Sequence, residues 1–106
     1  MPFFHVVRLS QAALIWADCP LGGVAGPELH RELRSLLDEA ATPLVIDLVR
    51  VPAVDDGVVS VLAAAASHAG FHGRAIELRL AGGYRFTVQD AGQLRQALAQ
   101  AFPTAA

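Results

Sequence analysis

The sequence predicts an α/β fold, in which a mixed β-sheet of four to five strands is flanked by three to four helices. Short apolar or alternating segments, typical of strands, take turns along the chain with segments whose leucines recur at helical spacing. Residues 12–80 read as strand–helix–strand–helix–strand, an order that favours parallel strands joined by right-handed crossovers. The length of 106 residues fits one domain. We therefore expect a single domain over residues 1–106, with a frayed tail at 103–106.

The N-terminal part is expected to begin with a hairpin. Residues 3–9 and 12–17 are β-rich and are separated by a short polar break. The first helix is expected to start at Pro27, which suits the first helical position, with Gly26 as its cap, and to end before Pro43. Its apolar residues follow the spacing i, i+4, i+7 and i+8 of one helical face. They are Leu29, Leu33, Leu36 and Leu37.

The middle of the chain predicts a buried strand followed by an unusual helix. Residues 44–48 form a nearly continuous apolar run, as in a parallel strand covered on both faces. The helix body is residues 58–69, which either Asp55 or Asp56 can cap and which Gly70 is expected to end. The polar residues of this body are Ser60, Ser67 and His68.

A helix that is apolar nearly all round is either fully buried or has a second apolar face for a partner. In a chain of 106 residues, little can be buried on all sides. Charged residues make up only 17% of the chain, so apolar surface is expected to remain exposed. We therefore expect the helix over 58–69 to contact a protein partner, either a different protein or a second copy in a homodimer.

The C-terminal part predicts a second hairpin and a last helix. Two alternating segments, residues 75–80 and 84–89, flank Gly82-Gly83, which is a typical hairpin pattern. Asp90 can cap a helix over 91–102, with leucines at helical spacing on its inner side.

Charge and composition exclude several function classes. The net charge is −2 and no basic run is present, so we expect no nucleic-acid partner. The longest apolar run, residues 58–66, is too short to span a bilayer. The first residues lack the pattern of a signal peptide, and Cys19, the single cysteine, permits no intramolecular disulfide. These features predict a cytoplasmic protein without a membrane span.

Residues 45–62, Val-Ile-Asp-Leu-Val-Arg-Val-Pro-Ala-Val-Asp-Asp-Gly-Val-Val-Ser-Val-Leu, resemble the signature of the STAS family. These are the sulphate-transporter and anti-sigma-factor-antagonist domains. Their pattern is a short strand with Asp-Leu, a loop, Asp-Ser-Ser-Gly or Asp-Ser-Thr-Gly, and an apolar helix. Asp47 matches the strand aspartate, Asp55 the loop aspartate, and Val61-Leu62 the helix. The resemblance covers residues 3–81 and implies a STAS-like fold.

Typical STAS antagonists are bound by an anti-sigma factor that is also a serine kinase, and phosphorylation at the start of the second helix releases the complex. The resemblance implies that this chain binds such an anti-sigma factor or switch-kinase-like protein. The partner-binding residues implied are Asp55, Asp56, Gly57, Val58, Ser60 and Val61.

This sequence departs from the family pattern at two places. The phosphorylated serine or threonine of the family falls on Gly57, and Asp56 stands where serine is usual. Binding is therefore expected to be constitutive, without a phospho-switch at that position. The family usually has a helix after the fourth strand, where this chain predicts the hairpin around Gly82-Gly83.

Two other interpretations of these residues stay open. Asp55 and Asp56 can be a helix cap and nothing more, or, with a histidine, part of a small metal- or ligand-binding enzyme. His68 and His72 have the i, i+4 spacing of two metal ligands, but a helix that ends at Gly70 would separate them. We expect no enzyme activity, no metal and no cofactor.

Overall fold

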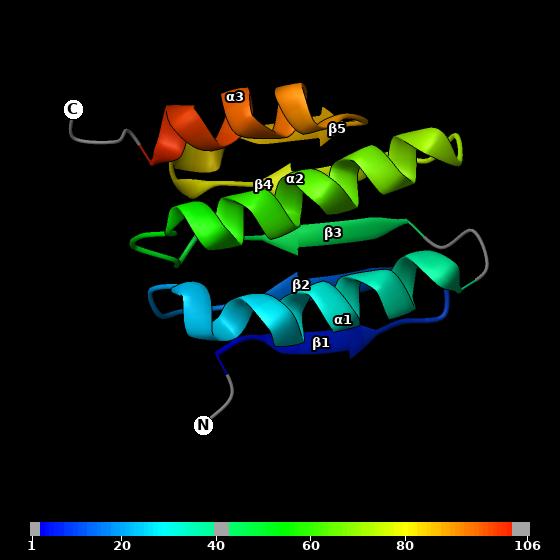
Figure 1. The fold of residues 1–106 in the computed structure, drawn as a ribbon, viewed down its shortest axis with the longest axis horizontal. Coiled ribbons are helices and arrows are strands. Elements are labelled where there is room, and N and C mark those ends of the chain that lie inside the picture. Colours follow the sequence, from blue (N-terminus) through cyan, green and yellow to red (C-terminus); the bar gives the residue numbers. More distant parts are fainter. Residues whose placement is uncertain (1–2, 40–42, 103–106) are drawn as a thin grey trace.

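The computed structural model describes residues 3–39 and 43–102. Five strands form one sheet in the order β1-β2-β3-β4-β5, and α-helices follow β2, β3 and β5 (Figure 1). The strands are β1 (His5–Arg8), β2 (Ala13–Trp16), β3 (Leu44–Asp47), β4 (Ile76–Arg79) and β5 (Arg85–Val88). The α-helices are α1 (Gly26–Asp38), α2 (Asp56–Phe71) and α3 (Ala91–Ala101), and short 3₁₀ turns are η1 (Gly23–Ala25) and η2 (Ala81–Gly83). This confirms the predicted α/β fold with a mixed sheet.

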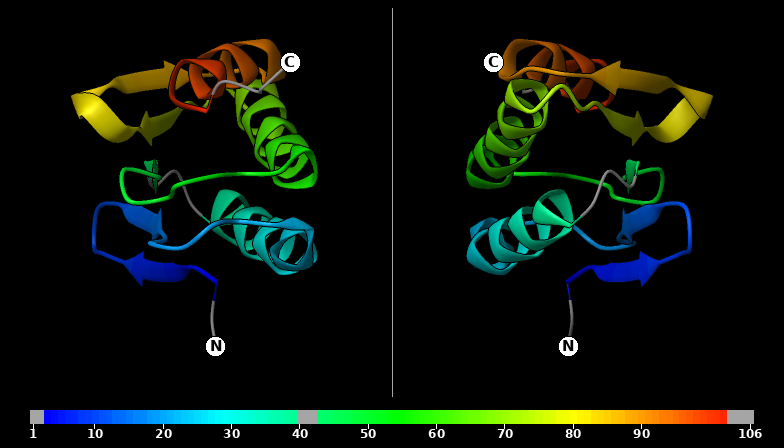
Figure 2. Two further views of the ribbon diagram at one scale, coloured as in Figure 1. Left: turned by 90° about the vertical axis from the view of Figure 1, so that its left-hand side faces the viewer. Right: turned by 90° about the vertical axis from the view of Figure 1, so that its right-hand side faces the viewer.

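The three α-helices all cover one face of the sheet, and the opposite face carries no helix (Figure 2). The central strands β2, β3 and β4 are parallel, while β1 and β5 run antiparallel at the two edges. Successive crossovers from β2 to β3 and from β3 to β4 step in the same direction across the sheet. Because each crossover is right-handed, its helix falls on the same side as the previous one.

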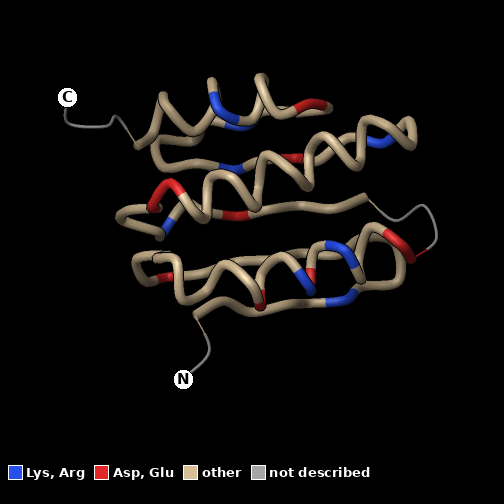
Figure 3. The backbone as a smooth tube through the Cα atoms, in the orientation of Figure 1, with Lys and Arg blue, Asp and Glu red and all other residues tan. Residues whose placement is uncertain are grey.

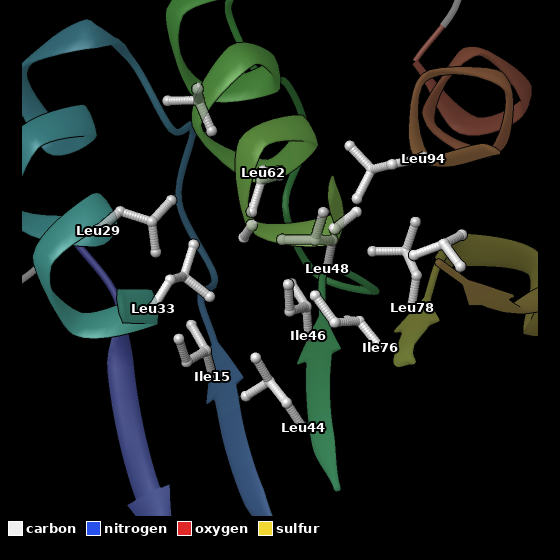
Figure 4. Packing of buried hydrophobic residues seen from close by; sticks show 14 of the residues in the cluster. Ile15, Leu29, Leu33, Leu44, Ile46, Leu48, Leu62, Ile76, Leu78 and Leu94 are labelled. Atoms are coloured by element: carbon white, nitrogen blue, oxygen red, sulfur yellow. The ribbon is translucent and has the colours of Figure 1, made fainter. Parts of the chain in front are cut away.

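The core lies between the helices and two rows of strand residues. Along each strand, alternate side chains point to the helix-covered face. The first row consists of Val6, Ile15, Ile46, Leu78 and Phe86, and the second of Arg8, Ala13, Leu44, Ile76 and Val88. In Figure 4 the strand side chains Ile15, Leu44, Ile46, Ile76 and Leu78 face leucines that the helices contribute, namely Leu29, Leu33, Leu62 and Leu94.

The environment of α2 corrects the expectation that this helix needs a partner to cover a second apolar face. It is the middle helix of the layer, packed against α1 on one side and α3 on the other, with the sheet beneath it (Figures 1 and 2). Three sides of the helix are therefore covered by the chain itself. Its buried residues are Val58, Leu62, Ala63, Ala65, Ala66 and Ala69. The many alanines allow this close packing, so most of its apolar surface is satisfied internally.

The end of α2 differs from the prediction, because Gly70 lies inside the helix and Gly73 ends it. Gly73 has the positive φ of 70° that suits glycine after a helix. The Arg74 amide donates to the Ala69 carbonyl oxygen at 2.7 Å, and the Gly73 amide donates to the Gly70 carbonyl oxygen at 3.0 Å. These two bonds are those of a Schellman motif, with Gly73 at the position after the cap.

Both predicted hairpins form. Between β4 and β5 the Leu80 amide donates to the Tyr84 carbonyl oxygen at 2.9 Å, and Gly82 and Gly83 have positive φ angles of 83° and 80°. Residues 85–88 are therefore a strand, as expected for this chain. The predicted tail at 103–106 lies outside the described residues.

The remaining helix ends agree closely with the sequence. Asp90 caps α3 by accepting a hydrogen bond from the Gln93 amide at 2.8 Å. Helix α1 starts at Gly26 after the 3₁₀ turn, so Pro27 is its second residue rather than its first. Within the described part of the chain, no helix has the length and apolar character needed to cross a membrane.

Candidate partner-binding surface

The first turn of α2 is organised by Asp55, which sits in extended conformation as the helix cap. Its Oδ1 accepts a hydrogen bond from the Val58 amide at 2.9 Å. This bond satisfies one of the backbone donors that every helix leaves free at its start. Of the two aspartates that could cap the helix, Asp55 does so, and Asp56 is the first helical residue. Asp56 therefore adds its charge at the positive end of the helix dipole.

Two loops that follow neighbouring parallel strands are joined beside this helix start. Leu21 and Val54 form an isolated parallel bridge. The Leu21 amide donates to the Ala53 carbonyl oxygen at 3.0 Å, and the Asp55 amide donates to the Leu21 carbonyl oxygen at 3.1 Å. These bonds fix the loop after β2 against the loop after β3. Since η1 is part of the loop after β2, it lies beside the start of α2.

Small residues make this close approach of the loops sterically feasible. A Cβ atom on Gly23 would lie only 3.3 Å from Oδ2 of Asp55, a tight contact, whereas one on Gly57 would lie at an ordinary 3.4 Å from Oδ1. The carboxylate of Asp55 is thus packed between the η1 turn and the first turn of α2. The result is a rigid corner whose shape is set by backbone hydrogen bonds and by one capping side chain.

Five of the six residues predicted to contact a partner lie wholly or partly on the surface at this corner. Asp55, Asp56, Gly57 and Ser60 are exposed, and Val61 is half-buried. Val58 is different, because its side chain has no exposed surface. Its expected contact with a partner is corrected here: Val58 points into the core beneath the first turn of α2.

The exposed side of α2 is a narrow stripe of small residues and not a broad apolar face. Beyond its acidic first turn, the helix carries no Asp, Glu, Lys or Arg (Figure 3). The stripe consists of Gly57, Ser60, Ala64 and Ser67, and ends at Phe71, whose side chain is 87% exposed. Because these side chains are short, another protein could approach the helix backbone closely along this line.

Two features beside the stripe extend the surface. Val24 in η1 is 81% exposed and lies on the side of α1. On the side of α3 a cavity of about 150 Å³ is lined in part by the apolar Val54, Val59 and Phe102. Sequence reasoning missed Val24, which belongs to a loop without a motif. The rule that loops after adjacent parallel strands meet at one sheet edge could have found it.

The histidines do not join Asp55 and Asp56 in a metal or catalytic site. His68 and His72 lie toward the other end of α2, where their ring centroids are 4.7 Å apart. The expectation that Gly70 would separate them is wrong, because the helix continues to Phe71. Even so, among residues 3–39 and 43–102 no three His, Cys, Asp or Glu side chains group in a way that could hold a metal ion.

A larger hollow, of about 330 Å³, lies away from this corner. Its lining includes Trp16, Asp47 and Arg50, at the carboxyl ends of β2 and β3, and does not include Asp55 or Asp56. Asp56 does line the smaller cavity of about 150 Å³, beside Arg95, but the lining includes no histidine, so the predicted set of two aspartates and a histidine is not brought together there.

Comparison with known proteins points to one family. A family model described as "Mlab, STAS domain" matches residues 22–84, which is more than half of the chain. The matched segment contains the η1 turn, the capped start of α2 and the whole of β4. No curated protein matches the chain significantly.

Proposed function

Because the chain belongs to the STAS domain family, we propose that it is a protein-interaction module that resembles an anti-sigma factor antagonist. Its partner would be an anti-sigma factor or a switch-kinase-like protein, and its role would be the regulation of transcription in the cytoplasm. The docking surface would consist of the acidic first turn of α2, the small-residue stripe and Val24.

The observation that carries this proposal is the exposed, rigid corner at the start of α2. This surface offers the charge of Asp56, the open backbone of Gly57 and the hydroxyl of Ser60. The Asp55 cap holds the turn in place. Such a preformed surface loses little conformational entropy when a partner binds. The segment that matches the family model, residues 22–84, includes this corner.

The same corner supports constitutive binding. A phosphate adds about −1.5 to −2 charge where it is attached and can thereby break a contact surface. Gly57 has no hydroxyl to receive one, and Asp56 already places a fixed charge at the adjacent position. Ser60 is exposed but lies inside the helix, one turn further along. We therefore propose that partner release does not depend on phosphorylation at the family's usual position.

Site-specific photo-crosslinking in cells tests the proposal. A photoreactive amino acid would replace exposed Ser60 in one variant and exposed Tyr84 of the β4–β5 turn in the control. We expect the Ser60 variant to capture an anti-sigma factor or a kinase-like ATPase, identified by mass spectrometry, and the Tyr84 variant to capture neither. Capture of the same proteins from both positions, or of no regulatory protein from Ser60, would contradict the proposal.

A further inference from the structure

The sheet face opposite the helices is uncovered, although its centre is built from parallel strands (Figure 2). All-parallel sheets are almost always covered on both faces, whereas sheets with antiparallel strands can expose one. Two rows of side chains cross this face. The first row consists of His5, Trp16, Asp47, Arg79 and Arg85, and the second of Val7, Leu14, Val45, Glu77 and Thr87.

This open face is divided into an apolar half and a charged half. Over β1 to β3 four side chains are apolar, namely Val7, Leu14, Trp16 and Val45, and Val7 is 36% exposed. His5 and Asp47 are the two polar residues of this half. Over β4 and β5 the residues are Glu77, Arg79, Arg85 and Thr87. Arg79 Nε donates to Glu77 Oε2 at 2.5 Å, so the two opposite charges are adjacent along one strand.

The order of these residues makes the face complementary to itself. Consider a two-fold axis that runs perpendicular to the strands, between two facing sheets and midway between the two rows. Each strand then lies over its own copy in the opposite direction, and each row faces the other row of the second molecule. Trp16 meets Leu14 of the second copy, and Arg79 meets Glu77 of the second copy. On β2 apolar residues thus face each other, and on β4 opposite charges do. On β3 Asp47 faces Val45 and keeps the hydrogen bond that its Oδ1 accepts from the Val49 amide at 3.0 Å.

The other two-fold arrangement, with the axis along the strands, fits less well. It would place β4 over β2 of the second copy, so that Glu77 would face Leu14. A carboxylate would then lose water without gaining a partner, which is unfavourable. That axis would also place the two Asp47 carboxylates opposite each other, because β3 would lie over β3 with equal rows facing. The perpendicular axis avoids this repulsion and pairs Glu77 with Arg79.

We propose that this open sheet face is the interface of a homodimer, formed by two copies packed face to face about that perpendicular axis. Sheets pack in this way about 10 Å apart with their strands roughly aligned. The contact leaves the stripe on α2 free on the outer side of each copy. The dimer would therefore present two partner-binding surfaces facing in opposite directions, and this inference does not depend on what binds there.

The size of the face sets the strength of the expected dimer. Five strands about 4.8 Å apart and four residues of about 3.3 Å each give a footprint of roughly 320 Å². Stable interfaces bury about 800 Å² of accessible surface on each partner. Even with the exposed Phe3 and Leu9 at the ends of β1, the area places this dimer among small, reversible interfaces. We expect dissociation in the micromolar range and a monomer–dimer equilibrium that follows concentration.

Charge reversal at the facing pair provides the decisive experiment. Glu77→Arg alone would place two arginines opposite each other, and Arg79→Glu alone would place two glutamates opposite each other. We expect each variant to dimerise at least tenfold more weakly in sedimentation velocity, and an equimolar mixture of the two to recover dimers as heterodimers. Loss of the Glu77–Arg79 contact within one strand cannot produce this recovery. Failure of the mixture to pair overturns the proposal.

Two further measurements keep the test independent of variant folding. Trp16 is the only tryptophan, so its emission maximum in the wild-type protein should shift to shorter wavelength as concentration rises and the dimer forms. Glu28→Arg and Arg31→Glu, at exposed positions of α1, carry the same charge changes away from the interface and should leave dimerisation unchanged. A wild-type protein that stays monomeric at all concentrations, or α1 variants as defective as those in β4, would overturn the interface.

Discussion

The backbone of Gly70 in α2 lies so close to Gln89, at the end of β5, that a Cβ atom at position 70 would be 1.8 Å from the Gln89 carbonyl oxygen. No real Cβ atom occupies such a position, and the obstacle is backbone that cannot rotate away. Alanine is normally favoured over glycine inside a helix by about 1 kcal/mol. We predict the opposite sign for Gly70→Ala, a loss of about 1–3 kcal/mol in the free energy of unfolding, measured by urea denaturation.

Gly57→Ala is the matched control for that substitution. It is also a helical glycine of α2, but a Cβ atom there would lie 3.4 Å from Asp55 Oδ1, an ordinary contact. It should therefore stabilise the protein by up to about 1 kcal/mol, as helix propensity predicts where nothing obstructs the Cβ atom. If Gly70→Ala stabilised the protein as much as helix propensity suggests, the close packing of α2 against the start of α3 would be disproved.

The two adjacent aspartates are expected to differ in their contributions to stability. Asp55→Ala removes the side chain that accepts from the Val58 amide and should cost about 1 kcal/mol. Asp56→Ala removes only a favourable interaction with the helix dipole, which should cost about 0.3–1 kcal/mol at low ionic strength. Because salt screens that interaction, the loss caused by Asp56→Ala should disappear at high salt. Urea denaturation at low and high salt measures both. Equal, salt-insensitive losses would mean that Asp55 is not the cap.

Val58 and Val61 separate folding from partner binding. Val58 has no exposed surface, so Val58→Asp would bury an unpaired carboxylate and should lower the free energy of unfolding by about 3 kcal/mol or more. Val61 is half-buried, and Val61→Asp should cost only about 1 kcal/mol. Thermal denaturation distinguishes them. A folded Val61→Asp variant with unimpaired partner capture would argue against docking along this side of α2.

The sequence predicted the elements well because each one has its own local pattern. Leucine spacing located α1, alternation located the β4–β5 hairpin, and Asp90 marked the start of α3. These signals depend on periodicity and capping within a few residues, so they can be recognised without knowledge of the tertiary structure. The family resemblance located the proposed docking corner in the same way, through a short contiguous motif around Asp55.

What the sequence could not provide was the neighbourhood of each element. The apolar surface of α2 seemed to need a partner because the position of the helix between α1 and α3 is a tertiary property. Gly70 and Gly73 both suit a helix end. In the structure Gly70 stays inside the helix, where it makes room for the backbone of Gln89. Gly73 has the positive φ and ends the helix. The exposure of Val24 likewise depends on the bridge between two distant loops.

Introducing the family's hydroxyl at position 57 tests the proposal that partner binding is constitutive. The site can accept Gly57→Ser, since the position is exposed and a Cβ atom makes only an ordinary 3.4 Å contact with Asp55 Oδ1. With its cognate kinase-like partner, we expect the variant to incorporate phosphate and then bind more weakly, because the added charge lies beside Asp56. The wild-type protein should do neither. Intact-mass spectrometry and a binding assay provide the measurements, with Gly57→Ala as the control. Phosphorylation of the wild-type chain, for instance at Ser60, would show that it retains a switch at another residue.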